Sequence, residues 1–149
     1  MISVCSHEEN QHLIKRIQQL HPHSEALWGT MTVTQMLAHC RKPLQFANGE
    51  MEMRKRLLYT IFGGIAKKIF VNPKPFLKNM PTDKCLIITN HDTFANEQQE
   101  LLTLLARFAQ QGHSIFTTKP HPIFGTMTPD EWDMLQWKHL DHHLRQFGV

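Results

Sequence analysis

The segment from Thr128 to Phe147 limits what this chain can fold into more than any other stretch, because its pattern predicts one complete helix. It opens with a threonine cap, a proline in the first turn and a glutamate at the reciprocal capping position. Residues three and four apart share one face of a helix, so His139 and His143 lie one turn apart. The fold must therefore accommodate a helix that presents paired imidazoles.

These two imidazoles continue an apolar line along the predicted helix. Trp132 and Leu135 precede His139 on the same stripe, and Gln146 extends the stripe beyond His143. Two histidines one turn apart on a buried face are a recurring half-site for a divalent metal. The alternative is a pair of core histidines bonded to the backbone or to Gln146, or half-exposed residues at the helix end.

A third candidate ligand lies on a second predicted helix, about 100 residues earlier. Thr32 followed by Gln35 matches a capping box, in which two side chains satisfy each other's free backbone amides. His39 shares a face with Gln35 and sits inside an apolar pattern of helical spacing. Pro43 either bends this helix or ends it early. A bend one turn past His39 does not exclude it as a ligand.

Three neutral imidazoles are a common ligand set for a metal site that keeps one coordination position open. We therefore predict that His39, His139 and His143 bind one divalent cation and leave a coordination position for water or substrate. His142 lies in the same arc and is the second choice for a ligand, although we expect it to line the pocket. His121 precedes the last helix, and we expect it either to flank the opening or to be a plain loop histidine.

Other conspicuous residues are expected to be structural or solvent-facing. Trp28 and Trp132 are expected to anchor the core, Asp141 to face solvent, and His91 and His113 to play no part in the site. Cys40 lies about 100° round the helix from His39, so we do not expect it to share the metal. The sequence contains no legible Ser-His-Asp arrangement, glycine-rich phosphate loop or paired-carboxylate motif.

Apolar periodicity predicts three further helices, over residues 7–20, 51–70 and 93–111. The expected buried residues are Leu13, Ile17 and Leu20 in the first, Leu57, Leu58, Ile61, Ile65 and Ile69 in the second, and Leu101, Leu104, Leu105 and Phe108 in the third. Gly63-Gly64 weakens the expected regularity of the second helix. The proline-rich stretch 71–92 is expected to be an irregular crossover with a short extended piece at 86–89.

The overall composition favours one globular domain over residues 1–149, because 41% of the residues are hydrophobic and 19% are charged. The net charge is only +3, and we expect the basic clusters at 54–56 and 67–68 to be solvated, with no nucleic-acid partner. Three cysteines without a CxxC spacing and the lack of a signal-peptide pattern favour the cytoplasm. The most apolar run, 57–71, is interrupted by glycines and lysines, so no membrane span is expected.

The two ends of the sequence resemble the DinB/YfiT-like superfamily of metal-dependent proteins. The residues that carry the resemblance are Thr34-Gln35-Met36-Leu37-Ala38-His39 and His139-Leu140-Asp141-His142-His143-Leu144-Arg145-Gln146. The stretch His121-Pro122-Ile123-Phe124-Gly125, followed by residues 128–132, is similar to an uncharacterised branch of that superfamily. Residues from about 50 to 110 match only in their helical character.

The resemblance implies an all-α, DinB-like four-helix bundle whose helices run up, down, down and up, with a long crossover and, here, an extra helical segment. The metal triad of that superfamily corresponds to His39, His139 and His143. Characterised relatives include thiol-dependent S-transferases and a thiol-dependent isomerase, in which the metal activates a low-molecular-weight thiol. The resemblance therefore implies a small-molecule substrate or such a thiol as the partner.

The expected function is divalent-metal binding, with a metal-bound thiol or water acting in S-transfer or hydrolysis. Zinc and nickel both suit imidazole ligands. Gln35, His121, His142 and Gln146 are the expected pocket or supporting residues. A non-catalytic, metal-stabilised binding module is the alternative, and a homodimer is compatible with such a bundle.

Overall fold

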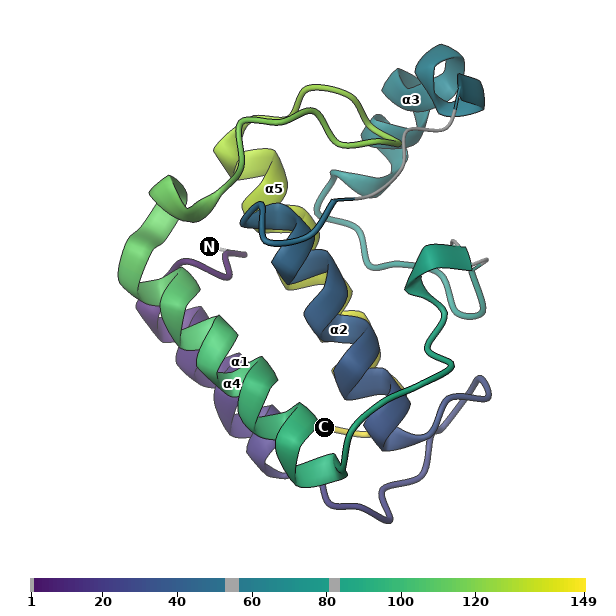
Figure 1. The fold of residues 1–149 in the computed structure, drawn as a ribbon, viewed down its shortest axis with the longest axis vertical. Helices are drawn as coiled ribbons and strands as arrows, with labels where there is room; N and C mark the ends of the chain where they lie inside the picture. The colour runs from purple at the N-terminus through teal and green to yellow at the C-terminus, as the bar shows by residue number, and fades with distance from the viewer. Residues whose placement is uncertain (1, 53–56, 81–83) are drawn as a thin grey trace.

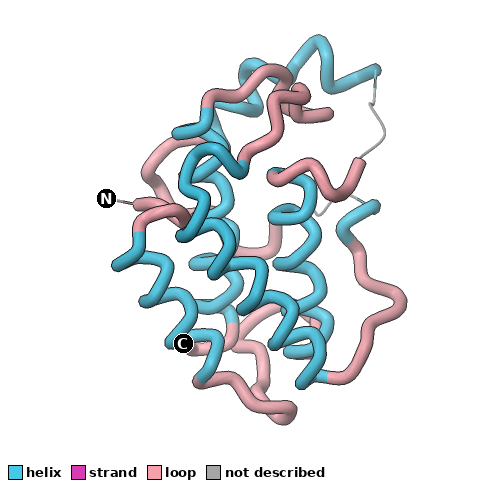
Figure 2. Tube along the Cα trace, turned by 60° about the vertical axis from the view of Figure 1, so that its left-hand side comes forward, coloured by secondary structure: helices cyan, strands magenta, loops and turns pink. Residues whose placement is uncertain are grey.

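The computed structural model describes residues 2–52, 57–80 and 84–149, and within them every regular element is helical (Figures 1 and 2). The elements are α1 His7–Gln18, α2 Val33–Ala47, α3 Leu57–Phe70, α4 Phe94–Gln111 and α5 Pro129–Gln146, with 3₁₀ turns η1 Lys84–Leu86 and η2 Gly112–Ile115. The prediction of an all-α chain is confirmed for these residues. Among them, no helix combines the length and the apolar character needed to cross a membrane.

Four of the helices pack against one another along their lengths. Both α1 and α2 contact α4 and α5. Figure 1 shows α1 and α5 running in one direction and α2 and α4 in the other. Because α2 and α4 are parallel, the chain has to return along the molecule between them. The connection over residues 48–93 makes this return, and α3 lies within it at one end of the molecule.

Reciprocal side-chain caps fix where α2 and α5 begin. The Thr32 hydroxyl accepts a hydrogen bond from the Gln35 N–H at 3.2 Å, and the Gln35 side chain accepts one from the Thr32 N–H at 2.9 Å. Thr128 and Glu131 repeat the arrangement at 3.2 and 2.8 Å. The two predicted capping boxes are therefore confirmed. By fixing where each helix begins, the caps determine which face of α2 carries His39 and which face of α5 carries the histidine pair.

The core is formed by apolar stripes from the four packed helices. Its largest fully buried apolar side chains are Leu13, Ile17, Met36, Leu37, Leu44, Leu101, Leu105, Phe108, Trp132, Leu140 and Leu144. Burial of each large apolar side chain contributes about 1.5–3 kcal/mol. The predicted stripes of α1 and α4 and the anchoring role of Trp132 are confirmed. Trp28 was expected in the core as well, but it is only partly buried and lies under the Lys78 ammonium.

The predicted buried face of α3 is wrong where it is described. Ile65 and Ile69 are 64% and 60% exposed, and the side chains of Leu57, Leu58 and Ile61 lie outside the described part of the chain. The face that packs carries Gly63 and Lys67, which are four residues apart. A Cβ on Gly63 would lie 2.4 Å from the Ile123 carbonyl oxygen.

Lys67 was expected to be solvated, but it holds α3 to the start of α5. Its ammonium donates to the Thr126 carbonyl at 2.9 Å and pairs with the Glu131 carboxylate at 2.7 Å. The other predicted basic cluster, at 54–56, includes no residue that the structure describes. Among the described residues of α3, the backbone approach at Gly63 and the Lys67 ion pair hold the helix in place, whereas Ile65 and Ile69 are exposed.

We predict opposite effects for alanine at the two glycines of α3. Gly63→Ala should lower the free energy of unfolding by about 2 kcal/mol, because the new methyl group collides with the Ile123 carbonyl. Gly64 is helical, and a Cβ there would meet no described atom within 4 Å beyond its chain neighbours and its own helix backbone, so Gly64→Ala should be stabilising by roughly 0.5–1 kcal/mol. Urea denaturation of both variants measures this difference. Equal effects would contradict the proposed packing of α3.

Three further expectations need correction. Residues 84–86 form η1, so Leu86 belongs to a 3₁₀ turn and not to the extended piece expected at 86–89. Helix α2 continues through Pro43 to Ala47, so the early end considered for it is wrong. Asp141 was expected to face solvent, but its carboxylate pairs with Arg16 of α1 at 2.9 Å and its side chain is only 18% exposed. Helical phase alone could not predict this contact, because it depends on which helix packs beside α5.

Candidate metal centre

His39 of α2 and His139 and His143 of α5 meet where the two helices pack. One ring nitrogen from each lies within 4.8 Å of the others. The His39 and His139 Nε2 atoms are 2.9 Å apart, and the three pairs of ring centroids are separated by 4.7 to 4.8 Å. The structure thus brings together three side chains that are up to 104 residues apart in sequence (143 minus 39).

Burial keeps these imidazoles neutral. His39 and His143 are 3% and 8% exposed, and His139 is partly exposed. Burial is the largest cause of a lowered pKa at all three rings, because the charged form is poorly solvated there. The pKa of His143 falls to about 3. At neutral pH each ring therefore retains a nitrogen lone pair that can bind a cation.

Hydrogen bonds at the far nitrogens fix two of the tautomers. The His39 Nδ1 lies 2.9 Å from the Leu86 carbonyl oxygen, which can only accept, so Nδ1 carries the proton. The His143 Nδ1 donates in the same way to the Gln146 Oε1 at 2.8 Å. Both rings therefore leave Nε2 unprotonated. A proton on Nδ1 bonded to a neighbouring acceptor is the usual arrangement behind a metal-binding Nε2.

The orientation of the Gln146 amide is fixed in turn by the loop before α2. Its Nε2 donates to the Trp28 carbonyl at 2.6 Å, which leaves its Oε1 as the acceptor for His143. Gly29 makes this approach possible, because a Cβ there would lie 2.6 Å from the Gln146 Nε2. Gly29 also has a φ of +80°, which favours glycine.

His142 lies beside the triad and also lines a small cavity. Its ring centroid is 5.0 Å from that of His143 and 5.9 Å from those of Trp28 and Phe76. The cavity has a volume of about 70 Å³. Its lining includes Trp28, Phe76, Lys78, Lys138, His142 and Arg145. His142 therefore contacts both the triad, through His143, and the residues of this cavity.

A family model described as "Protein of unknown function (DUF1569)" matches residues 5–148, which is nearly the whole chain and includes the three imidazoles and Gln146. The chain belongs to the DUF1569 family. No curated protein and no solved structure matches it. The description of the DUF1569 family names no activity, so the chemistry of this chain has to be argued from its own residues.

Two predicted pocket residues of this DUF1569 chain are engaged elsewhere. The Gln35 side chain caps the start of α2. His121 is buried under the 121–125 turn, where its Nδ1 accepts hydrogen bonds from the Ile123 and Phe124 N–H groups at 3.1 and 3.2 Å. Its ring packs against Phe46, Phe124 and Trp132. His121 is therefore a loop histidine, which was one of the two expectations, but it is buried and holds the 121–125 turn.

Cys40 follows His39 on α2 but does not join the triad. Its Sγ lies 3.6 Å from the Met36 sulfur, inside the core. This contact is consistent with the expectation that helical phase directs Cys40 away from the imidazoles. Cys40 is therefore a useful reference thiol for experiments on this DUF1569 chain.

The structure also brings together residues that sequence reasoning missed. The Leu86 carbonyl, at the end of η1, and the Trp28 carbonyl, in the loop before α2, support the triad, and no side-chain pattern could indicate them. Cys5, His113 and Asp133 form a second cluster with one ligand atom each within 4.8 Å. His113 was expected to play no part in a site. The three residues lie in separate segments, so no local spacing in this DUF1569 sequence could indicate them.

Proposed function

We propose that this chain binds a divalent metal ion through the Nε2 atoms of His39 and His143 and one ring nitrogen of His139. The observation that carries the proposal is the convergence of three neutral imidazoles, two of which have their proton fixed on the opposite nitrogen. Neutral imidazole is a preferred ligand for both zinc and nickel. The residues present therefore fit such an ion.

We further propose a DinB-like four-helix bundle, running up, down, down and up, as the scaffold of this site. The directions of α1, α2, α4 and α5 support it, as does the long connection between α2 and α4. In this arrangement α3 is the extra helical segment. The antiparallel packing of α2 against α5 supplies the first histidine from one helix and the H-x-x-x-H pair from the other.

The proposed activity is S-transfer or hydrolysis at an electrophilic centre of a small molecule. A metal with three protein ligands keeps a position for water or a low-molecular-weight thiol, lowers the pKa of that ligand and polarises a carbonyl. His39 and His143 would keep their Nε2 atoms directed at the ion through their Nδ1 hydrogen bonds. His142, Trp28 and Phe76 line the adjacent cavity and would contact a reactant there.

A non-catalytic, metal-stabilised binding module is the second candidate. The observation that favours it is the small size of the cavity beside His142, about 70 Å³, because pockets for drug-sized ligands are several times larger, about 300 Å³ or more. In that case the ion would stabilise the packing of α2 against α5. The cytoplasmic location and the homodimer remain predictions from the sequence.

Metal binding to untagged, metal-free protein tests the proposal. Wild type should take up one more equivalent of zinc or nickel than His139→Ala, whereas His12→Ala, which replaces an exposed histidine, should match wild type. Inductively coupled plasma analysis after dialysis measures the content, and circular dichroism checks the fold. Equal metal content in wild type and His139→Ala would reject the site.

Activity assays then separate the two candidates. Zinc- or nickel-loaded protein is mixed with a low-molecular-weight thiol and an electrophilic acceptor, or with a hydrolysable ester. An enzyme should lose the rate on metal removal and in His139→Ala. A binding module should show no rate above that of the free metal, and its melting temperature should still rise on metal addition.

A further inference from the structure

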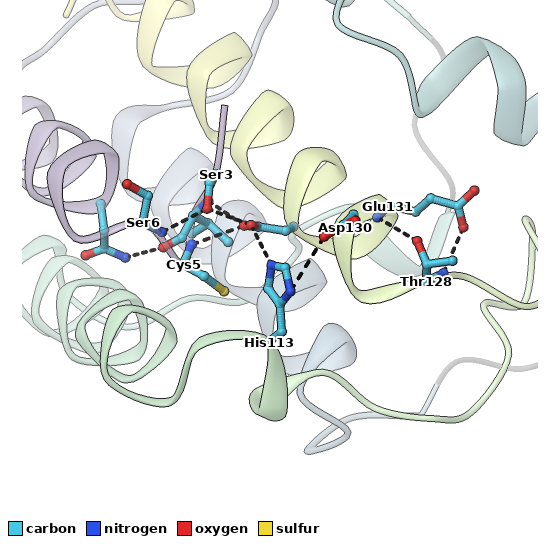
Figure 3. A network of polar contacts seen from close by, with 10 residues as sticks. Ser3, Cys5, Ser6, His113, Thr128, Asp130 and Glu131 are labelled. Carbon is cyan, nitrogen blue, oxygen red and sulfur yellow. Dashed lines mark hydrogen bonds and ion pairs between the residues drawn. The ribbon is translucent and has the colours of Figure 1, made fainter. Parts of the chain in front are cut away.

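A second group of metal-ligating side chains lies away from the triad. Cys5 belongs to the segment before α1, His113 to η2 and Asp133 to α5. One ligand atom from each lies within 4.8 Å of the others. In Figure 3 the Cys5 sulfur and the His113 ring lie beside each other, below the Ser3 hydroxyl. The cluster shares no residue with the triad on α2 and α5.

The spacing of these atoms is close to what a tetrahedral ion requires. Zinc bonds of ordinary length place neighbouring ligand atoms about 3.3 to 3.6 Å apart. The His113 Nε2 and the Asp133 Oδ2 are already 3.2 Å apart. The Cys5 sulfur lies within 4.8 Å of one ring nitrogen of His113 and one carboxylate oxygen of Asp133, so a small shift of this side chain completes a three-ligand face.

Hydrogen bonds hold the Asp133 carboxylate in a fixed orientation. Its Oδ1 accepts from the Val4 and Cys5 N–H groups at 2.6 and 3.1 Å, and its Oδ2 accepts from the Ser3 hydroxyl at 2.6 Å. The carboxylate is almost fully buried, with 6% of its side chain exposed. The same bonds hold the backbone of Cys5 against α5. Both ligands are therefore preorganised by the neighbouring chain.

The cluster is open to solvent on the His113 side, where that ring is 47% exposed. The exposed Asp130 carboxylate lies 3.6 Å from the His113 Nδ1, and a small shift would let it accept a hydrogen bond from the Nδ1 proton when Nε2 binds an ion. Cys5 itself is a poor free nucleophile, because burial and the adjacent Asp133 raise its pKa to about 12. The arrangement therefore does not favour a Cys-His-Asp catalytic triad.

We propose that Cys5, His113 and Asp133 form a second divalent-metal site, selective for zinc or another thiolate-preferring transition metal. Sulfur and imidazole ligands select such ions over magnesium and calcium. The Cys5 thiol releases its proton to solvent when the metal–sulfur bond forms. Solvent supplies the fourth ligand, and the bound ion joins the N-terminal segment to η2 and α5. The proposal of this second site does not depend on metal binding by the triad on α2 and α5.

Cobalt(II) distinguishes the two sites by spectrum. A thiolate ligand gives cobalt a charge-transfer band in the near ultraviolet, which an all-histidine site cannot give. Titration of reduced, metal-free wild type should produce this band, and Cys5→Ser should abolish it. His113→Ala should weaken cobalt binding at this site at least tenfold. Cys40→Ser, which replaces the buried core thiol, should keep the band at full intensity.

The triple variant His39→Ala/His139→Ala/His143→Ala separates this proposal from the proposed function. It should keep the thiolate band while losing the absorption of histidine-bound cobalt. A wild type that stays folded but shows no thiolate band at saturating cobalt would overturn the second site, leaving a hydrogen-bonded anchor for the N-terminal segment. A band that survives in Cys5→Ser but disappears in Cys40→Ser would also overturn it.

Discussion

Acidification from pH 7 to pH 4 should remove about 3 kcal/mol of unfolding free energy through His121 alone, in protein kept free of metal. Burial lowers the pKa of this ring to about 4, from the 6.5 that is usual for an exposed histidine. Between these two values the unfolded chain binds a proton at this residue and the folded chain does not. Stability therefore falls as the pH drops through this window, and His121 causes no further loss below about pH 4.

The surroundings of His121 explain why protonation is so unfavourable. Its ring is stacked on Phe124 and packs against Phe46 and Trp132, none of which can stabilise a positive charge through an ion pair. Its Nδ1 accepts two backbone hydrogen bonds, so a proton there would break both of them. The folded state therefore requires the neutral ring.

Urea denaturation of wild type and His121→Asn at pH 7 and pH 4.5 measures this contribution. Asparagine retains an acceptor near the position of Nδ1 but does not titrate. The variant is expected to be less stable than wild type at pH 7, because it loses the packing of the ring. Its additional loss at pH 4.5 should be smaller than that of wild type by about 2.5 kcal/mol. Identical acid losses in the two proteins would show that His121 is not buried as neutral imidazole.

Much of the fold was predictable because its signals are local. The threonine caps of α2 and α5 bond to residues three positions away, and the buried stripes of α1 and α4 follow from helical spacing. α3 shows the limit of this reasoning. Ile65 and Ile69 belong to a clear apolar period but are exposed, and the described contacts of α3 include the distant Ile123 carbonyl and Glu131. A period identifies a helix face without specifying which segment will cover it.

The same distinction applies to the candidate site. The sequence alone was enough to predict the i,i+4 spacing of His139 and His143 and the position of His39 on an apolar helix face. It also placed Gln146 on the same helix face as the histidine pair. The supporting carbonyls of Leu86 and Trp28 come from η1 and from the loop before α2, and no apolar periodicity describes the path of either segment. Cys5, His113 and Asp133 were missed for this reason, since only the tertiary fold makes them neighbours.

Replacing Gln146 by leucine should weaken binding of zinc or nickel at the triad by about ten- to a hundredfold. The Gln146 Oε1 is the hydrogen-bond acceptor that keeps the proton on the His143 Nδ1. Without it, neutral His143 is free to carry the proton on Nε2, the nitrogen that would bind the ion. The ring would also lose the contact that fixes its rotation. Isothermal titration calorimetry of metal-free protein measures the change in affinity.

Gln136→Leu is the matched control for this variant. Gln136 is also a buried glutamine of α5, 2% exposed against 3% for Gln146, and its Oε1 has no hydrogen-bond partner among the described residues. Its replacement should leave metal affinity unchanged. Nitrogen-15 shifts of the imidazoles add a readout without metal, because only Gln146→Leu should move the His143 proton towards Nε2. Equal affinities in Gln146→Leu and wild type would mean that this hydrogen bond does not prepare His143 as a ligand.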